Sequence, residues 1–386
     1  MERNASHTGA VLNAGAPSAN ESRYTHTSSQ RGSRIIKNWL LALVAFALSL
    51  GAAELVLRWW VEPSRIYSSL RELPAANAWK NRVRYWERYH ERGTSGLAHD
   101  PMLGWDHDIA GDRIRGNATY AAPPQDDSGT RIVAIGDSYT YGNEVEAHEN
   151  FAALLDAQSG VQVLNMGVPG YGVGQAFLKW REHGRQYRPD VVVFGIYVDD
   201  YERASVTFSS AAKPRLVLRN GEIAVEGQPV PTPAEALTRI AAELDERVRV
   251  VDAVRNILLK ARTGAEARET YFTEMDAVVR AMLQSLLASL NDAQRLLVVH
   301  IPRAEAFVKP DPFRTEMSAR LTSIYTQLGI DHIDLGEEFL RGRSARDAFM
   351  DLYVHRPSGS VGHLSPAGHQ VVADLVASRL TLTSSR

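Results

Sequence analysis

The chain has 386 residues, a formal net charge of −2 and no cysteine. The near-neutral charge, without a long basic run, gives no electrostatic basis for binding nucleic acid. The lack of cysteine excludes thiol catalysis, thiolate metal sites, disulfides and a lipoprotein anchor. No cluster of His, Asp and Glu has the spacing of metal ligands, so we expect neither a metal nor another cofactor.

The composition of the chain changes abruptly within its first 60 residues. Residues 1–33 are rich in Ser, Asn, Thr and Gly, which predicts a disordered tail. Residues 34–60 predict a transmembrane signal-anchor helix, because the run WLLALVAFALSLGAA has Ser49 as its only polar side chain. We expect membrane contact through residues 35–60. Basic residues precede the run at Arg31, Arg34 and Lys37. By the positive-inside rule they predict a cytoplasmic tail and an exported C-terminal part.

Two other interpretations of this segment stay open. Gly51, Ala52 and Ala53 are small residues that suit cleavage of a signal peptide, and a buried core helix has a similar composition. Glu54 lies near the end of the run, where a carboxyl group at membrane depth is costly. Residues 61–97, with aromatic and basic residues at mixed spacing, predict a juxtamembrane linker or helix.

Residues 98–386 predict an α/β domain. Five short apolar runs are typical of buried parallel strands, and they start near positions 131, 161, 189, 295 and 331. Helical patterns lie between or after them, at residues 149–157, 174–187, 313–328 and 365–380. This alternation predicts a doubly wound, mostly parallel five-stranded sheet in a flavodoxin-like three-layer sandwich.

Chemically useful residues stand at the ends of these predicted strands. In doubly wound sheets, ligands bind beyond the carboxyl ends of the strands. Ser138 follows the first strand, a Gly-rich turn with Gly170 follows the second, and His363 precedes the last helix. A serine and a histidine at one rim form a nucleophile and its base, and a glycine turn offers a backbone N–H to an oxyanion.

Three segments carry a family resemblance. AIGDSYTYG, VLNMGVPGYGVGQ and GHLSPAGH resemble the first, second and last sequence blocks of SGNH (GDSL-type) hydrolases, above all bacterial membrane-anchored members. The segment from His99 to Trp105 is similar to one that precedes the domain in those relatives.

The resemblance implies a role for each matching residue. Ser138 would be the nucleophile, and its N–H would be one oxyanion donor. The N–H of Gly170 would be the second donor, and His363 would be the base. Asp137 and Asn165 would hold the two loops as structural residues.

The chain departs from the family pattern at two places. The third block has Asp199 and Asp200 where the family has Asn and Asp. Asp199 therefore takes the expected third oxyanion position, or it caps its loop and is turned away from the site. The acid that usually precedes the last-block histidine is replaced. We expect Asp351, Asp200 or another acid from elsewhere in the chain to serve as a displaced triad acid. A Ser-His dyad and an inactive site are the alternatives.

An insertion at residues 205–291 interrupts the resemblance. Asn220 and Gly221 predict a hairpin turn, and amphipathic helices are expected at residues 233–262 and 266–290. Because the insertion follows the third strand, it could serve as a lid, as a glycan-recognition surface or only in packing.

The expected function is that of an extracytoplasmic serine esterase in the bacterial inner membrane. Its substrate would be a small-molecule or glycan ester, an O-acyl carbohydrate or a lipid, cleaved through an acyl-serine intermediate. A polysaccharide O-acyltransferase, or a catalytically degenerate scaffold protein of an envelope assembly, are the alternatives. The sequence leaves the substrate, protein partners and oligomeric state open.

Overall fold

A computed structural model describes residues 21–67, 74–88, 97–107, 113–115, 129–158, 161–262 and 264–380. It divides into two compact units, Met1–Val61 and Glu62–Arg386. Of the predicted disordered tail, residues 1–20 lie outside the described residues, and the remainder continues the first helix.

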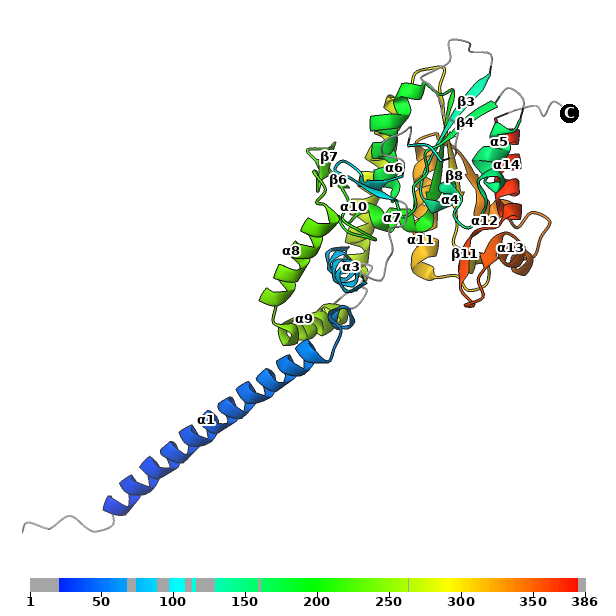
Figure 1. The fold of residues 1–386 in the computed structure, drawn as a ribbon. Coiled ribbons are helices and arrows are strands. Elements are labelled where there is room, and N and C mark those ends of the chain that lie inside the picture. The colour runs from blue at the N-terminus through cyan, green and yellow to red at the C-terminus, as the bar shows by residue number, and fades with distance from the viewer. Residues whose placement is uncertain are drawn as a thin grey trace, which may run out of the picture. The chain divides into compact units, whose positions relative to one another are not determined.

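The first unit contains one long helix, α1 (Glu21–Trp59) (Figure 1). Its Ser33–Trp59 segment is long and apolar enough to cross a membrane, a property that anchors and signal sequences share. The costly carboxylate in this segment has a partner, because Arg58 Nε donates to Glu54 Oε1 over 2.6 Å. This pair lies one turn apart on the helix.

The second unit is built on a five-stranded parallel sheet, which confirms the predicted fold class. The strands are ordered β4-β3-β5-β8-β9, and every neighbouring pair is parallel. Their bounds are β3 (Thr130–Ile135), β4 (Val161–Asn165), β5 (Val191–Tyr197), β8 (Arg295–Ile301) and β9 (Asp331–Asp334). The last four residues of β3 are completely buried, as are most of those in β5, because helices cover both faces.

Helices cover the two faces of this sheet in separate groups (Figure 1). One group pairs α5 (Phe151–Asp156) with α14 (Pro366–Arg379). The other contains α6 (Val173–Lys179), α10 (Ala265–Ala288) and α11 (Pro312–Gln327), and α10 contacts both of its neighbours. The result is the expected three-layer sandwich.

The insertion begins with the predicted hairpin. Strands β6 (Arg215–Arg219) and β7 (Glu222–Glu226) pair antiparallel, in register across the turn. Asn220 and Gly221 both have positive φ, 54° and 83°, as the two central residues of a tight hairpin turn require.

The helix predicted over residues 233–262 is in fact two helices, α8 (Pro233–Glu246) and α9 (Arg249–Arg262). Arg247 interrupts them with an extended backbone, φ −84° and ψ 137°. Its guanidinium donates to both carboxylate oxygens of Asp252 and lies 4.2 Å from the ring centre of Trp79. These contacts offset the hydrogen bonds that a continuous helix would have made at this point.

The predicted linker contributes two helices to the second unit. They are α2 (Pro63–Ile66) and α3 (Pro74–Arg88). Helix α3 contacts α8, and Arg82 forms an ion pair with Glu243. The segment therefore packs on the insertion.

Shorter elements surround the carboxyl ends of the sheet strands. They are β1 (Ala98–Asp100), β2 (Gly104–Asp106), α4 (Ser138–Tyr141), α7 (Val198–Ala204), α13 (Ala345–Asp351), β10 (Tyr353–His355) and β11 (Val361–Leu364).

Candidate active site

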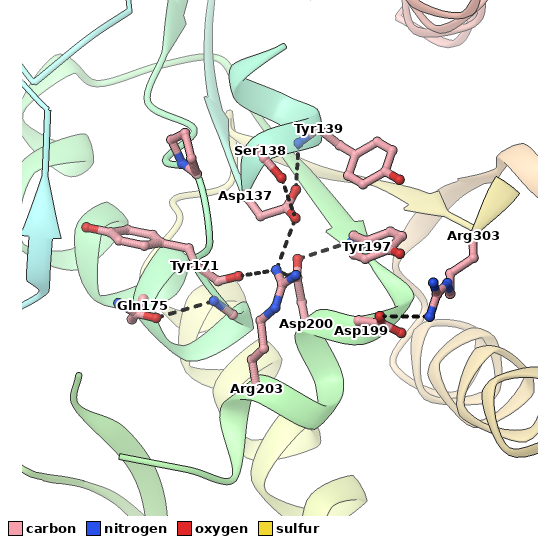
Figure 2. Close-up of polar contacts among 12 residues, drawn as sticks. Asp137, Ser138, Tyr139, Tyr171, Gln175, Tyr197, Asp199, Asp200, Arg203 and Arg303 are labelled. Atoms are coloured by element: carbon pink, nitrogen blue, oxygen red, sulfur yellow. Dashed lines mark hydrogen bonds and ion pairs between the residues drawn. The ribbon is translucent and has the colours of Figure 1, made fainter. Parts of the chain in front are cut away.

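Ser138 stands at the first position of α4, just beyond the carboxyl end of β3. Asp137 caps this helix, because its Oδ1 accepts the Tyr139 backbone N–H over 2.8 Å (Figure 2). This is the local structural role expected for Asp137. The serine is 6% exposed, so the turn presents its hydroxyl at the floor of the site.

His363 reaches the serine from strand β11, 225 residues later in the chain. Its Nε2 lies 2.9 Å from Ser138 Oγ, a hydrogen-bond distance that suits transfer of the serine proton. The imidazole packs on the ring of Tyr139, with 4.9 Å between ring centres. Because Tyr139 lies next to the nucleophile, this contact fixes the two catalytic candidates relative to each other.

The other nitrogen of the imidazole meets a carboxylate that we did not predict from the sequence. Glu144 Oε2 lies 2.6 Å from His363 Nδ1 and also accepts the His363 backbone N–H over 2.9 Å. Arg356 donates two hydrogen bonds to the same carboxylate, from Nε to Oε1 over 2.6 Å and from Nη2 to Oε2 over 2.9 Å. Glu144, His363 and Ser138 therefore form a continuous chain of polar contacts.

The surroundings of Glu144 keep it charged. The hydrogen bond from Arg356, and then those from His363, lower the pKa of Glu144 to about 2. The charged form is therefore stabilised at all pH values above its ordinary range, and this stabilisation is lost only as the pH falls towards about 2. An ionised Glu144 accepts a hydrogen bond, so it places the imidazole proton on Nδ1 and leaves Nε2 free to accept the serine proton.

Two backbone features make room for this carboxylate. Glu144 itself has a positive φ of 69°, which is unusual for a residue with a side chain. A Cβ atom at Gly362 would collide with the Glu144 carboxylate. A glycine immediately before His363 is therefore needed for this contact.

The expected triad acids, Asp351 and Asp200, lie elsewhere, and this part of the sequence prediction is wrong. Asp351 ends α13, and its backbone carbonyl accepts the Ser365 hydroxyl. Asp200 is 1% exposed and accepts hydrogen bonds from Arg203 and the Tyr197 backbone N–H. Burial, and then the nearby charge of Asp137, raise the pKa of Asp200 well above its usual value.

Gly170 lies in the loop after β4 and has a φ of 83°, in the region that favours glycine. Asn165 holds the start of this loop, because its Nδ2 donates to the Thr140 carbonyl and its Oδ1 accepts the Gly167 N–H. Within the described part of the chain, neither the Ser138 N–H nor the Gly170 N–H donates a hydrogen bond. Both are available to a developing oxyanion.

The hairpin β1–β2, upstream of the sheet, supports the loop that carries Gly170. Trp105 Nε1 donates to the Pro169 carbonyl over 2.9 Å, and the Tyr171 hydroxyl donates to the Trp105 carbonyl over 2.6 Å. Gln175 also donates to the Leu103 carbonyl. The segment from His99 to Trp105 thus clamps the residues on both sides of Gly170.

A buried ion network ties this hairpin to the core. Lys179 Nζ lies 2.7 Å from Asp106 Oδ1, and both side chains are completely buried. Arg113 bridges Asp106 and Asp100. Burial lowers the pKa of Lys179 to about 8, and the charge of Asp106 opposes that shift. Removing either partner would leave a buried charge uncompensated.

Asp199 does not occupy the expected oxyanion position. Its carboxylate accepts from Arg314 Nε over 2.7 Å and Arg314 Nη2 over 3.3 Å, with Arg303 Nη1 at 3.5 Å. Figure 2 shows this side chain directed towards Arg303, away from Ser138. Of the two alternatives for Asp199, the oxyanion role is therefore wrong, because two arginines more than 100 residues later in the chain bind the carboxylate.

Residues of the Asp199 ion pairs line two cavities. One, of about 370 Å³, is lined by residues of α3 and α7 and by the serines at 205, 209 and 210. The other, of about 960 Å³, lies beyond β8 and is lined by Arg303 and Arg314 among others.

No group of three or more His, Cys, Asp or Glu residues in the described ranges could hold a metal ion.

The chain is similar to several proteins of known structure. No curated protein matches the chain. Among solved structures, it is similar to a lipolytic protein of the G-D-S-L family from Desulfitobacterium hafniense, with 13% identity and a TM-score of 0.37, over 65% of this chain and 99% of that one. It is also similar to an acetylxylan esterase from Geobacillus stearothermophilus, with 15% identity and a TM-score of 0.38, over 68% and 99%.

The decisive match is to a sequence family. The GDSL-like lipase/acylhydrolase family matches residues 134–371, a range that includes Ser138, Glu144, Gly170 and His363. With the fold and the serine-histidine contact already in place, the chain belongs to the GDSL-like lipase/acylhydrolase family.

Proposed function

We propose that this protein is a serine esterase that acts outside the cytoplasm on an O-acyl carbohydrate or a lipid. The continuous contacts from Glu144 through His363 to Ser138 are the observation that carries the proposal. They supply an oriented base for the nucleophile even though the usual acid of the last sequence block is absent. A complete contact chain of this kind favours an active enzyme over a degenerate scaffold protein.

The geometry suggests the following reaction. Ser138 Oγ attacks the ester carbonyl while His363 Nε2 takes its proton, and the charge of Glu144 stabilises the imidazolium that forms. The backbone N–H groups of Ser138 and Gly170 stabilise the oxyanion. The imidazolium then protonates the leaving alcohol, which leaves an acyl group on Ser138. Water, activated by the same imidazole, releases the acid and regenerates the serine.

The first test is the nucleophile. We expect Ser138→Ala to lower kcat for an activated acetyl ester by about 10³-fold or more, because the acyl-enzyme cannot form. The assay compares the full chain in detergent with Ser323→Ala, an exposed serine on α11, as the matched control. Equal rates for wild type and Ser138→Ala would contradict the proposal.

The second test is the acid. We expect Glu144→Gln to lower kcat by about 10³–10⁴-fold, because a neutral amide no longer fixes the imidazole tautomer or stabilises its charge. Asp351→Asn is the matched control and should retain activity, since the carboxylate that contacts His363 Nδ1 is that of Glu144. If Asp351→Asn were the damaging change instead, Glu144 would not be the orienting acid.

The third test concerns Asp199. Because its carboxylate binds Arg314 and Arg303, we expect Asp199→Asn to change kcat by no more than about twofold. The loss of a partly buried ion pair should lower the free energy of unfolding by about 1 kcal/mol. Denaturant unfolding and the ester assay measure both quantities, with Asp331→Asn as an exposed ion-pair control. A tenfold gain in kcat would instead indicate that Asp199 faces the oxyanion.

The export of the second unit is also a proposal, supported by the apolar Ser33–Trp59 helix and the basic residues before it. A reporter that is active only in the cytoplasm, fused after Arg386, should give no signal in intact cells. The same reporter fused to residues 1–33 alone is the positive control. Strong signal from the full-length fusion would refute this orientation.

A further inference from the structure

Helix α9 of the insertion has its polar side turned inward. Asp252 is 9% exposed and accepts a hydrogen bond from the Tyr67 hydroxyl over 2.6 Å, in addition to its two from Arg247. Asn256, one turn later, donates to the Ile66 carbonyl over 2.7 Å. The contacts of α9 with the segment around α2 are therefore made by an acid and an amide.

The opposite side of α9 is apolar and exposed. Val251, Val254, Ile257 and Leu258 are between 51% and 68% exposed, and Val248 just before the helix is 50% exposed. Their spacing places them on one face, which is the reverse of the usual arrangement for a surface helix. A contiguous apolar surface of this kind marks an interaction site.

The charges beside this face are basic. Arg255 and Lys260 are exposed on α9, and the helix's one acid, Asp252, lies on the inner side. The preceding helix α8 is different, because it carries four acids and one arginine. A helix with an apolar face flanked by Lys and Arg is typical of helices that lie in the interface of an anionic bilayer.

The contact of α9 with a residue that follows closely after α1 also supports a lipid bilayer as its partner. Its contact residue Ile66 comes seven residues after Trp59, the last residue of the apolar helix α1. Seven residues span at most roughly 25 Å even when fully extended. If α1 is in a bilayer, chain connectivity alone keeps α9 within reach of its surface. Figure 1 shows α9 at the end of the second unit that is remote from the central sheet.

We propose that α9 docks on the surface of an anionic lipid bilayer, with Val251, Val254, Ile257 and Leu258 inserted among the acyl chains near the headgroups. The face buries its apolar side chains in lipid while Arg255 and Lys260 bind the phosphates. This contact is a second attachment besides α1. It would hold the second unit at a fixed height and orientation above the membrane, and it does not depend on the proposed esterase activity.

The chain has no cysteine, so single-cysteine variants can be labelled at chosen positions. We would attach a nitroxide to Val251→Cys and Ile257→Cys in the full chain, reconstituted in vesicles of phosphatidylglycerol and phosphatidylcholine. Collision with apolar oxygen should exceed collision with a water-soluble nickel complex several-fold at both sites. Met350→Cys, 49% exposed on α13, is the matched control and should show the opposite ratio.

Three results separate the possible outcomes. Loss of the lipid signature in vesicles of phosphatidylcholine alone, or in the double variant Arg255→Gln with Lys260→Gln, would support the role of headgroup charge. Labels at Val251 and Ile257 that are as open to the nickel complex as Met350 would overturn the proposal. Labels that are shielded from both reagents and show dipolar coupling between two chains would also overturn the proposal, and would indicate that α9 packs on a second copy of this chain. Retained far-UV circular dichroism confirms that each variant is folded.

Discussion

The carboxylate of Glu144 is the contact on which the rest of the site depends. It joins the loop after the nucleophile to the last strand of the domain, 219 residues later, through Nδ1 and the backbone N–H of His363. Arg356 holds it from the other side. A hydrogen bond to a charged group is stronger than a neutral one, and here four N–H groups of two residues share one carboxylate. Its orientation determines the orientation of the imidazole.

The structure accommodates this contact at a local cost. Glu144 adopts a backbone conformation that is rare for side chains, and the strand carrying His363 requires a glycine where the two segments approach. Strained residues of this kind persist only where surrounding contacts determine them fully. The oxyanion loop is held by comparable means, through the Trp105 clamp and the buried pair of Lys179 with Asp106. Both halves of the site therefore rely on residues distant in sequence.

Much of this structure was predictable from local sequence. Parallel strands buried on both faces give continuous apolar runs, so the strands and the residues at their carboxyl ends, including Ser138, could be located. His363 lies outside this sheet and was located from its resemblance to the last sequence block. The Glu144 contact could not be located this way. The family pattern directs attention to positions just before the histidine, while Glu144 lies six residues after Ser138 in a segment without periodicity. The sequence also shows that α9 is amphipathic, but not that its polar side faces inward.

The adjacent acids Asp199 and Asp200 show why a local motif does not determine a local role. One is directed to Arg303 and Arg314, and the other is buried against Arg203. Neither carboxylate therefore opposes a negative charge that develops at Ser138. The proposed oxyanion site has two backbone donors, the N–H groups of Ser138 and Gly170, and lacks the side-chain amide that the family resemblance implies. Loss of one such donor costs about 10²–10³ in rate, so we expect the proposed esterase to be slower than an otherwise equal site with three donors. The orientation of His363 by Glu144 does not replace that donor, because the base acts on the serine proton and the donor acts on the oxyanion.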